Sequence, residues 1–445
     1  MKQLVLAFSH NCSKVELSVA CCLSTVGISS RSLSFQSSHT SQNLSFLAID
    51  VYAKLVVLVL KILSVTVRVI QKDAEEKRAS FNPRPYFRLF INWFFNLLAP
   101  DSIIEGCSFQ MLQTSAGFQL SDLFMGFLNI SLACVILQLL RRSFMCCFAW
   151  LDLISHRSFM PKLLIVNPPK GWPHVQRLLV DLYKFMEPYL RNAELGETIH
   201  FLYKGTLRVL LVLLHDFPEF LCDYHFSFCD VIPSSCIQMR NVILSAFPHN
   251  MRLPDPSTPN LKIDLLAEIN QSPRIFSEVD AALKAKQMKS DVDEYLKTRY
   301  QGTFLSELVQ RLLLTQNEAT QAGTWYNVPL INSLVLYVGM QTIQQLEAKN
   351  PHPLAQMTNN DSVELLIAMD IFWILIADFD SEGRYLFLNA IVNQLRYPNN
   401  HTHFFSYVLL YLFVNANQDL YTSYAKCDLL TALHSLLDRK LYRSK

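Results

Sequence analysis

The side chains best suited to bind a metal lie close together in the sequence, at Cys222, His225, Cys229 and Cys236. The first three are spaced i, i+3 and i+7, so they would share one face of a helix. Zinc is bound by Cys and His, but this spacing is not a usual zinc frame. Because cysteine is among the most buried residue types, we interpret Cys222 and Cys229 as core residues and His225 as a hydrogen-bonded core histidine.

An acidic cluster at Asp378, Asp380 and Glu382 could suggest the two-metal chemistry of nucleases. Asp380, however, directly precedes the apolar sequence SEGRYLFLNAIVNQL. Aspartate is a preferred helix N-cap, and a glutamate in the first turn is stabilised by the positive end of the helix dipole. We therefore predict that Asp380 caps a helix.

Two further histidines, His401 and His403, precede another apolar stretch, where cap and first-turn residues are as suitable as metal ligands. No third ligand lies nearby in the sequence. A metal-dependent hydrolase that combines Cys222, His225, Asp378 and His403 is an alternative hypothesis without a recognised ligand frame.

The spacing of the glycines excludes the common phosphate-binding loops. The closest pairs, Gly117 with Gly126 and Gly196 with Gly205, are nine positions apart, whereas such loops need several glycines together. Neither Gly-x-Ser-x-Gly nor His-Glu-x-x-His occurs. We predict that the chain is not an enzyme and that it has no cofactor and no catalytic or metal site.

Composition favours helices and an intracellular protein. The 445 residues include only 11 glycines, and 51% are apolar. The formal net charge of +2 is too small for the basic surface that nucleic acid requires, so no direct specific nucleic-acid binding is expected. The 11 cysteines include no Cys-x-x-Cys, which indicates reduced thiols of the cytoplasm or nucleus.

The N-terminal third is divided by composition. Residues 24–45 contain nine serines, and we predict that residues 1–46 are disordered. Residues 47–147 are predicted to form a helical region, interrupted at 71–85 by a charged segment that ends in two prolines.

Residues 123–140 are uncharged and precede Arg141 and Arg142, which meets the minimum for a membrane span. Asn129 and Gln138 are costly in lipid, so we favour a buried helix. A membrane-anchored helical protein stays the alternative function.

Apolar spacing predicts a series of helices in the rest of the chain. One follows Trp172 and closes near Pro188, with a stripe of Val175, Leu178, Leu179, Leu182, Phe185 and Met186. Residues 206–220 are apolar nearly all round for nine positions, which predicts a helix buried between neighbours. Further helices are expected at 261–270, 288–315, 328–348, 361–377, 384–396 and 402–416. Their spacing in pairs predicts an all-α, HEAT-like helical-repeat superhelix.

Several long stretches closely resemble the large Not-type scaffold subunit of the Ccr-Not mRNA deadenylase complex. They are residues 203–269, YLKTR at 295–299, YNVPLINSLVLYVG at 326–339, and DSEGRYLFLNAIVNQLRYPNNHTHFFSYVLLYLF at 380–413. The resemblance implies that residues 148–416 are the Not-type C-terminal helical-repeat domain. Residues 1–46 and parts of 47–147 diverge from the family pattern. Residues 417–445 also diverge and form a separate tail.

The resemblance also implies a non-catalytic function. Such a scaffold docks the heterodimer of Not-box subunits, and in some animals short peptides of translational repressors such as Nanos. It would thereby support mRNA deadenylation, mRNA decay and translational repression, in the cytoplasm, including mRNA-processing bodies, and in the nucleus.

Two segments are predicted to bind partners, because they put apolar, aromatic and charged groups on accessible, partly non-helical backbone. The first is the loop 247–259, which contains four prolines. The second lies around residues 396–403 and the helix before it. The predicted partner-binding residues are Met251, Arg252, Leu253, Pro254, Arg384, Tyr385, Asn389, Arg396, Tyr397, His401 and His403.

Overall fold

A computed structural model of the chain describes residues 144–157, 159–165, 168–191, 195–252, 266–299, 303–349 and 363–415, with scattered positions at 69–88, 255 and 259. The predicted disordered segment 1–46, the membrane-span candidate 123–140 and the tail 417–445 lie outside these residues. Among the helices that are described, none is both long and apolar enough to cross a bilayer.

The described chain is helical, with one isolated antiparallel β-bridge between Leu313 and Tyr326. It divides into two compact units, Met1–Phe185 and Met186–Lys445. The first unit contains α7 (Phe144–Ile154), α8 (Met160–Ile165) and most of α9 (Pro168–Leu190). Its apolar side chains pack around a small space lined by Ile154, Phe159, Met160, Val175, Leu178 and Leu179.

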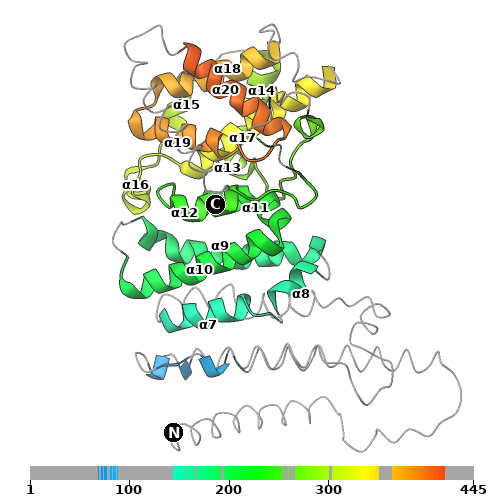
Figure 1. Cartoon of the computed structure of the whole chain (residues 1–445). Coiled ribbons are helices and arrows are strands. Elements are labelled where there is room, and N and C mark those ends of the chain that lie inside the picture. The colour runs from blue at the N-terminus through cyan, green and yellow to red at the C-terminus, as the bar shows by residue number, and fades with distance from the viewer. Residues whose placement is uncertain are drawn as a thin grey trace, which may run out of the picture. The chain divides into compact units, whose positions relative to one another are not determined.

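The second unit contains the remaining helices (Figure 1). They are α10 (Glu197–Asp216), α11 (Pro218–Val231), α12 (Ile237–Leu244), the 3-10 turn η3 (Ala267–Asn270), α13 (Ala281–Ala285), α14 (Lys289–Thr298), α15 (Phe304–Arg311), α16 (Gln316–Ala322), α17 (Val328–Lys349), α18 (Val363–Asp378), α19 (Ser381–Val392) and α20 (Asn400–Asn415). Helices that follow one another also pack together, at α10 with α11, α11 with α12, and from α17 through α20. This is the packing of helical-repeat proteins, and the all-α, HEAT-like prediction is confirmed.

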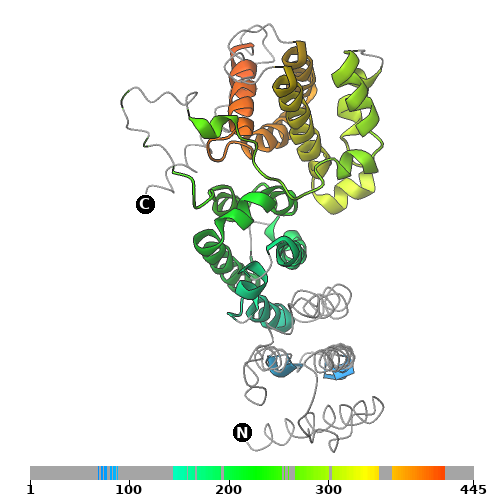
Figure 2. The ribbon, with the colours of Figure 1, turned by 90° about the vertical axis from the view of Figure 1, so that its right-hand side faces the viewer.

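Helix α17 is the centre of the second unit. Ten consecutive residues, 330–339, are buried, which covers every side of the helix. It contacts α11, α13, α14, α18, α19 and α20, and Figures 1 and 2 show α18, α19 and α20 gathered around it. A helix that is apolar all round must lie inside the protein, since every face removes apolar surface from water.

Helix α20 approaches α17 closely at Gly339. A Cβ built at this position would overlap the ring of Phe405, with Cε2 at 2.9 Å, and would lie 3.3 Å from Cε1 of Phe404. The two phenylalanine rings are themselves packed edge to face, 5.1 Å apart. The missing side chain of glycine therefore makes room for the aromatic residues of α20.

The structure confirms some predicted helices and corrects others. All six residues of the α9 stripe are buried, and α17 matches the predicted 328–348 almost residue for residue. The single helix predicted over 288–315 is wrong: α14 ends where Arg299 adopts a left-handed conformation (φ 55°), and α15 begins at Phe304. In the stretch 261–270, the described residues form only the 3-10 turn η3.

The prediction that residues 206–220 form one fully buried helix is also wrong. Helix α10 ends at Asp216, and Pro218 starts α11, because proline favours the first turn of a new helix. Leu211 and Val212 of α10 are 49% and 45% exposed. An all-apolar pattern therefore does not distinguish a buried helix from one that presents apolar residues to solvent.

The substitution Gly339→Ser should destabilise the second unit by about 2 kcal/mol, because inserted atoms in a packed core force neighbours out of position. Gly196, the N-cap of α10, has no atom within 4 Å of a built Cβ. The same change there, Gly196→Ser, should alter the free energy of unfolding by less than about 0.5 kcal/mol. Urea unfolding followed by circular dichroism compares the two variants; equal stabilities would contradict the close approach at Gly339.

Candidate partner-docking surfaces

The proline-rich loop begins at an anchored position. The backbone N–H of His249 donates to Oε1 of Glu219 at 2.8 Å, and the His249 ring lies 3.1 Å from Oε2. Burial raises the pKa of Glu219, but the hydrogen bonds from His249 outweigh it and hold that pKa below its usual value. Arg252 is exposed and Met251 half-buried just beyond this anchor. Leu253 and Pro254 lie outside the described residues.

The prediction that the segment around residues 396–403 is accessible is wrong for Arg396, Tyr397 and His401. Arg396 is 9% exposed, Tyr397 5% and His401 4%. Nη1 of Arg396 donates to the backbone carbonyl of Cys222 in α11 at 3.0 Å, and its guanidinium stacks over the Tyr397 ring at 5.0 Å. The connection between α19 and α20 is therefore folded inward, and a backbone carbonyl of α11 accepts a hydrogen bond from its arginine.

Hydrogen bonds within this connection replace those that solvent would make. The Thr402 hydroxyl donates to the Tyr397 carbonyl at 2.8 Å, and the Thr402 N–H donates to Oδ1 of Asn399 at 2.9 Å. Nδ2 of Asn400 donates to Ser272 at 2.6 Å and to Glu347 at 2.8 Å. A loop with satisfied backbone can be buried without a large desolvation cost.

Arg384 is also buried, at 9% exposure, so the prediction that it is accessible is wrong too. Its Nε donates to the carbonyl of Ile376 at 2.9 Å, near the C-terminus of α18. The carbonyls at the end of a helix lack partners within the helix, and a guanidinium there supplies donors and complements the dipole. The role of Arg384 in the structure is to join α18 to α19.

Three predicted residues lie on helices with at least part of their surface in solvent. Tyr385 is 43% exposed on α19, and Asn389 lies one turn further along and is half-buried. His403 of α20 is half-buried as well. Together with Met251 and Arg252, they stay predictions as partner-binding residues.

Burial and hydrogen bonds show the structural roles of the residues that could have bound a metal. Nδ1 of His225 donates to the Cys222 carbonyl at 2.9 Å, and Cys222 and Cys229 are buried, so their interpretation as core residues is confirmed. Asp380 is the N-cap of α19, and its carboxylate accepts from the Gly383 N–H at 2.8 Å and from the Tyr326 hydroxyl at 3.0 Å. Among the residues that the structure describes, no three His, Cys, Asp or Glu side chains are arranged to hold a metal ion.

The inward connection creates a buried polar cluster, formed by Asp223, His225, Arg396 and His401. Burial lowers the pKa of His401 to about 3, helped by the charge of Arg396. Burial and the same arginine hold the pKa of His225 well below its usual value. Burial raises the pKa of Asp223 to about 6, against the opposing effect of Arg274, whose Nε lies 3.7 Å away, and of Arg396. The cluster therefore favours neutral histidines.

The sequence reasoning missed the exposed apolar residues. On α10, Phe201, Leu211 and Val212 are 55%, 49% and 45% exposed; on α20, Leu410 and Val414 are both 64% exposed. No predicted site included these residues. The sequence does contain one indication of an exposed surface on α10: residues 198–215 include apolar and basic side chains but no acidic one.

Comparisons with known proteins agree on one family. Residues 132–427 match the family described as "CCR4-Not complex component, Not1". The chain is 40% identical over 371 residues to the Caenorhabditis elegans "CCR4-NOT transcription complex subunit let-711", a match that covers 81% of this chain and 13% of that protein. It is 31% identical over 365 residues to the Saccharomyces cerevisiae "General negative regulator of transcription subunit 1", covering 79% of this chain and 16% of that protein. The chain thus spans only a small part of either relative.

Two solved structures are similar. The NOT1 superfamily homology domain from Chaetomium thermophilum has a TM-score of 0.69 at 21% identity and covers 88% of this chain and 73% of its own. A structure titled "Not1 C-terminal domain in complex with Not4" has a TM-score of 0.67 at 25% identity and covers 95% of this chain and 82% of its own.

Acidification should destabilise the protein between pH 7.5 and 5.5. The two histidines stay neutral when folded but bind protons when unfolded, so their stabilising contribution is lost as pH falls below about 6.5. Asp223 acts in the opposite direction, because its raised pKa favours proton binding in the folded state. Because two histidines oppose one aspartate, the free energy of unfolding should fall by about 2 kcal/mol between pH 7.5 and pH 5.5.

Urea unfolding at pH 7.5 and 5.5 measures this loss. His401→Gln should reduce it by about 1 kcal/mol, since one of the two histidines is gone. His200→Gln, at an exposed position, should show the same loss as the wild-type protein. If His401→Gln and the wild-type protein lose the same free energy of unfolding between the two pH values, His401 does not cause the loss.

Arg396→Ala should lower the free energy of unfolding by about 2 kcal/mol, because it removes a charged hydrogen-bond donor and leaves a buried carbonyl without it. Tyr385→Ala should change it by less than about 0.5 kcal/mol, as expected for a surface substitution. Thermal and urea unfolding of both variants test this assignment. A stable Arg396→Ala variant would show that the inward connection does not depend on Arg396.

Proposed function

The chain belongs to the Not1 family of CCR4-Not complex components, and from this membership we propose that it is a non-catalytic scaffold that docks other subunits of the complex. The family's named relatives are large subunits, of which this chain corresponds to one segment. The proposal assigns to this segment the docking of partners on helix faces and loops.

The observation that carries the proposal is the likeness of nearly the whole chain to a Not1 C-terminal domain solved in complex with Not4. We propose that this chain likewise binds a Not4-type protein. A rigid helical stack suits this task, because helical repeats present extended surfaces to peptides and helices without catalytic side chains. In the second unit, α17 supplies the rigid centre around which such surfaces are built.

We further propose that the chain docks the heterodimer of Not-box subunits and accepts short peptides of translational repressors such as Nanos. Through these partners it would support deadenylation, mRNA decay and translational repression in the cytoplasm, including mRNA-processing bodies, and in the nucleus. Met251, Arg252, Tyr385, Asn389 and His403 are the predicted contact residues that the described structure leaves wholly or partly accessible.

Co-purification of the full chain with the two Not-box subunits of the same organism tests the proposal, with a Not4-type protein in a parallel preparation. Each mixture should give one stoichiometric peak on a sizing column. A folded chain that elutes alone from both mixtures would contradict the scaffold function. Circular dichroism of that chain at pH 7.5 establishes that it is folded.

Tyr385→Ala separates binding from folding in the same assay. If α19 contributes to docking, this variant should keep its helical spectrum but bind its partner about tenfold more weakly, as loss of an interface tyrosine often does. Trp325→Ala is the matched control, since Trp325 is also exposed, at 54%, and is not a predicted contact. Equal binding by both variants would exclude Tyr385 from the interface.

A further inference from the structure

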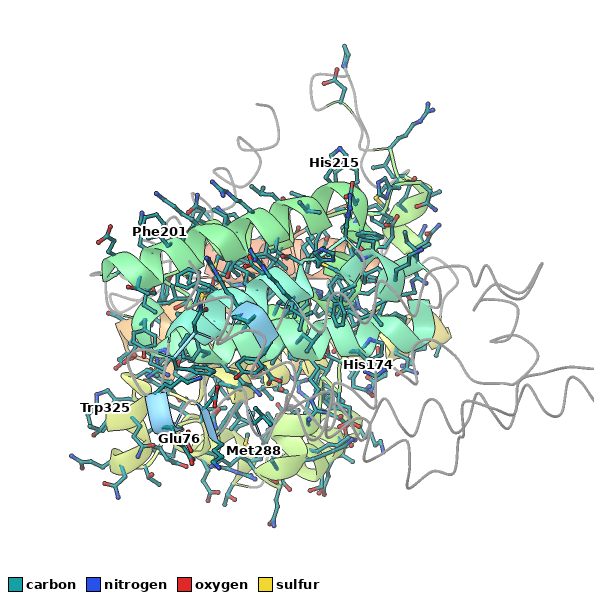
Figure 3. The ribbon with its side chains drawn as sticks, turned by 90° about the horizontal axis from the view of Figure 1, so that it is seen from below. Glu76, His174, Phe201, His215, Met288 and Trp325 are labelled. Atoms are coloured by element: carbon teal, nitrogen blue, oxygen red, sulfur yellow. The ribbon has the colours of Figure 1, made fainter. Side chains whose placement is uncertain are left out.

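One face of α10 presents a continuous row of exposed side chains. They follow the helical spacing i, i+3, i+7, i+10, i+11 and i+14, and we call them the α10 stripe: Phe201, Lys204, Arg208, Leu211, Val212 and His215. Figure 3 shows Phe201 and His215 on the outer side of α10 toward its two ends. With a rise of 1.5 Å per residue, the stripe is about 20 Å long.

The stripe is not needed to hold α10 in place. The opposite side of the helix is buried through Leu202, Thr206, Val209, Leu210 and Leu213. Helices α11 and α12 pack against α10, and the Tyr203 hydroxyl donates to the Gln238 side chain of α12 at 3.0 Å. The exposed row therefore lies on a helix that its opposite face already holds in place.

Three large apolar side chains on this fixed helix are unusually open to solvent. Phe201 is 55% exposed, Leu211 49% and Val212 45%. Single exposed apolar residues are common, but a row of them at helical spacing marks an interaction surface. An amphipathic helix that lay along α10 would cover all three.

The charges of the stripe specify the partner. Between Glu197 and Asp216 the helix has no acidic residue, whereas Lys204 and Arg208 lie one turn apart on the stripe. Within the described part of the chain, neither cation takes part in a salt bridge. At the end of the helix, His215 is paired with Asp216 at 2.6 Å. A partner surface that binds the stripe would therefore need carboxylates opposite Lys204 and Arg208.

A helix of a partner protein fits these features better than an anionic membrane. Each basic residue near an anionic bilayer contributes about 1 kcal/mol, so two cations give weak attachment. A protein helix can instead bury Phe201, Leu211 and Val212 and pair both cations with carboxylates spaced four residues apart.

The second exposed row, Leu410 and Val414 of α20, offers no such argument. It has no charged residue beside it on α20, and the chain continues from there into residues outside the described structure. Of these two described rows, only the α10 stripe combines apolar exposure with charge of one sign.

We propose that the α10 stripe is a docking surface for an acidic amphipathic helix of a partner protein. This inference rests on the proposed scaffold function and adds to it one interface and the chemistry of its occupant. The apolar side chains supply the buried area, and Lys204 and Arg208 fix the direction and register of the bound helix.

Fluorescence anisotropy with the full chain tests the proposal. The probe is a labelled synthetic helix with leucine at i, i+3, i+4 and i+7 repeats and glutamate at the flanking positions. The second peptide has lysine in place of every glutamate, and vesicles with phosphatidylserine form the third arm. The acidic peptide should bind saturably and more weakly at high salt, and the lysine peptide should bind at least about tenfold more weakly.

Paired variants locate the binding site. Lys204→Glu with Arg208→Glu, and separately Phe201→Ser with Leu211→Ser, should each weaken binding of the acidic peptide at least about tenfold. Lys297→Glu and Trp325→Ser, at exposed positions away from α10, are the matched controls and should bind like the wild-type chain. Circular dichroism confirms that every variant is folded.

The inference would be overturned by no saturable binding of the acidic peptide, by equal binding of the two peptides, or by binding that the α10 variants leave unchanged. Binding to the vesicles without binding to the peptide would also overturn it, since the occupant would then be a membrane. No other subunit takes part in this titration. A failure here is therefore distinct from a failure of the co-purification that tests the scaffold function.

Discussion

The burial of α17 is the constraint on which the second unit depends. Ten consecutive buried residues leave the N-terminal half of this helix no side for solvent, so other helices must surround it there. Removing that much apolar surface from water is the largest favourable contribution to folding. Polar links then fix the positions of the surrounding helices. Asn332 donates to Asp230 of α11 at 2.9 Å, and Tyr337 donates to Asp293 of α14 at 2.6 Å.

The inward fold of the connection between α19 and α20 follows from the same packing. Because α19 and α20 both pack against α17, the seven residues between them, 393–399, are brought against α11, where Arg396 reaches the Cys222 carbonyl. Burying a guanidinium and two histidines is costly unless they have partners or stay neutral. The Cys222 carbonyl accepts from Arg396 and from His225, and burial holds the pKa of both histidines well below normal, which favours their neutral form. These residues hold the scaffold together from inside.

Docking must therefore use what the helical stack leaves outside. The described surface has exposed side chains on α10, α19 and α20 and at Arg252. On α10, one face completes the core while the other presents apolar residues beside Lys204 and Arg208, which form no salt bridge with any described residue. A scaffold of this kind separates its functions by helix face, because core packing fixes one side of each helix and leaves the other available to partners.

The sequence by itself determined the fold class, the family resemblance and helices such as α9 and α17. Few glycines, long apolar stretches and the Asp380 cap are local features, and each acts within a few residues of chain. Burial was decided only by tertiary structure. Arg396 and His401 have the composition of a surface loop yet lie inside, while Leu211 and Val212 have the composition of a core helix yet face solvent. The reason is physical: exposure depends on which distant segments pack against a residue, and the contact of residue 396 with residue 222 leaves no mark in the local sequence of either.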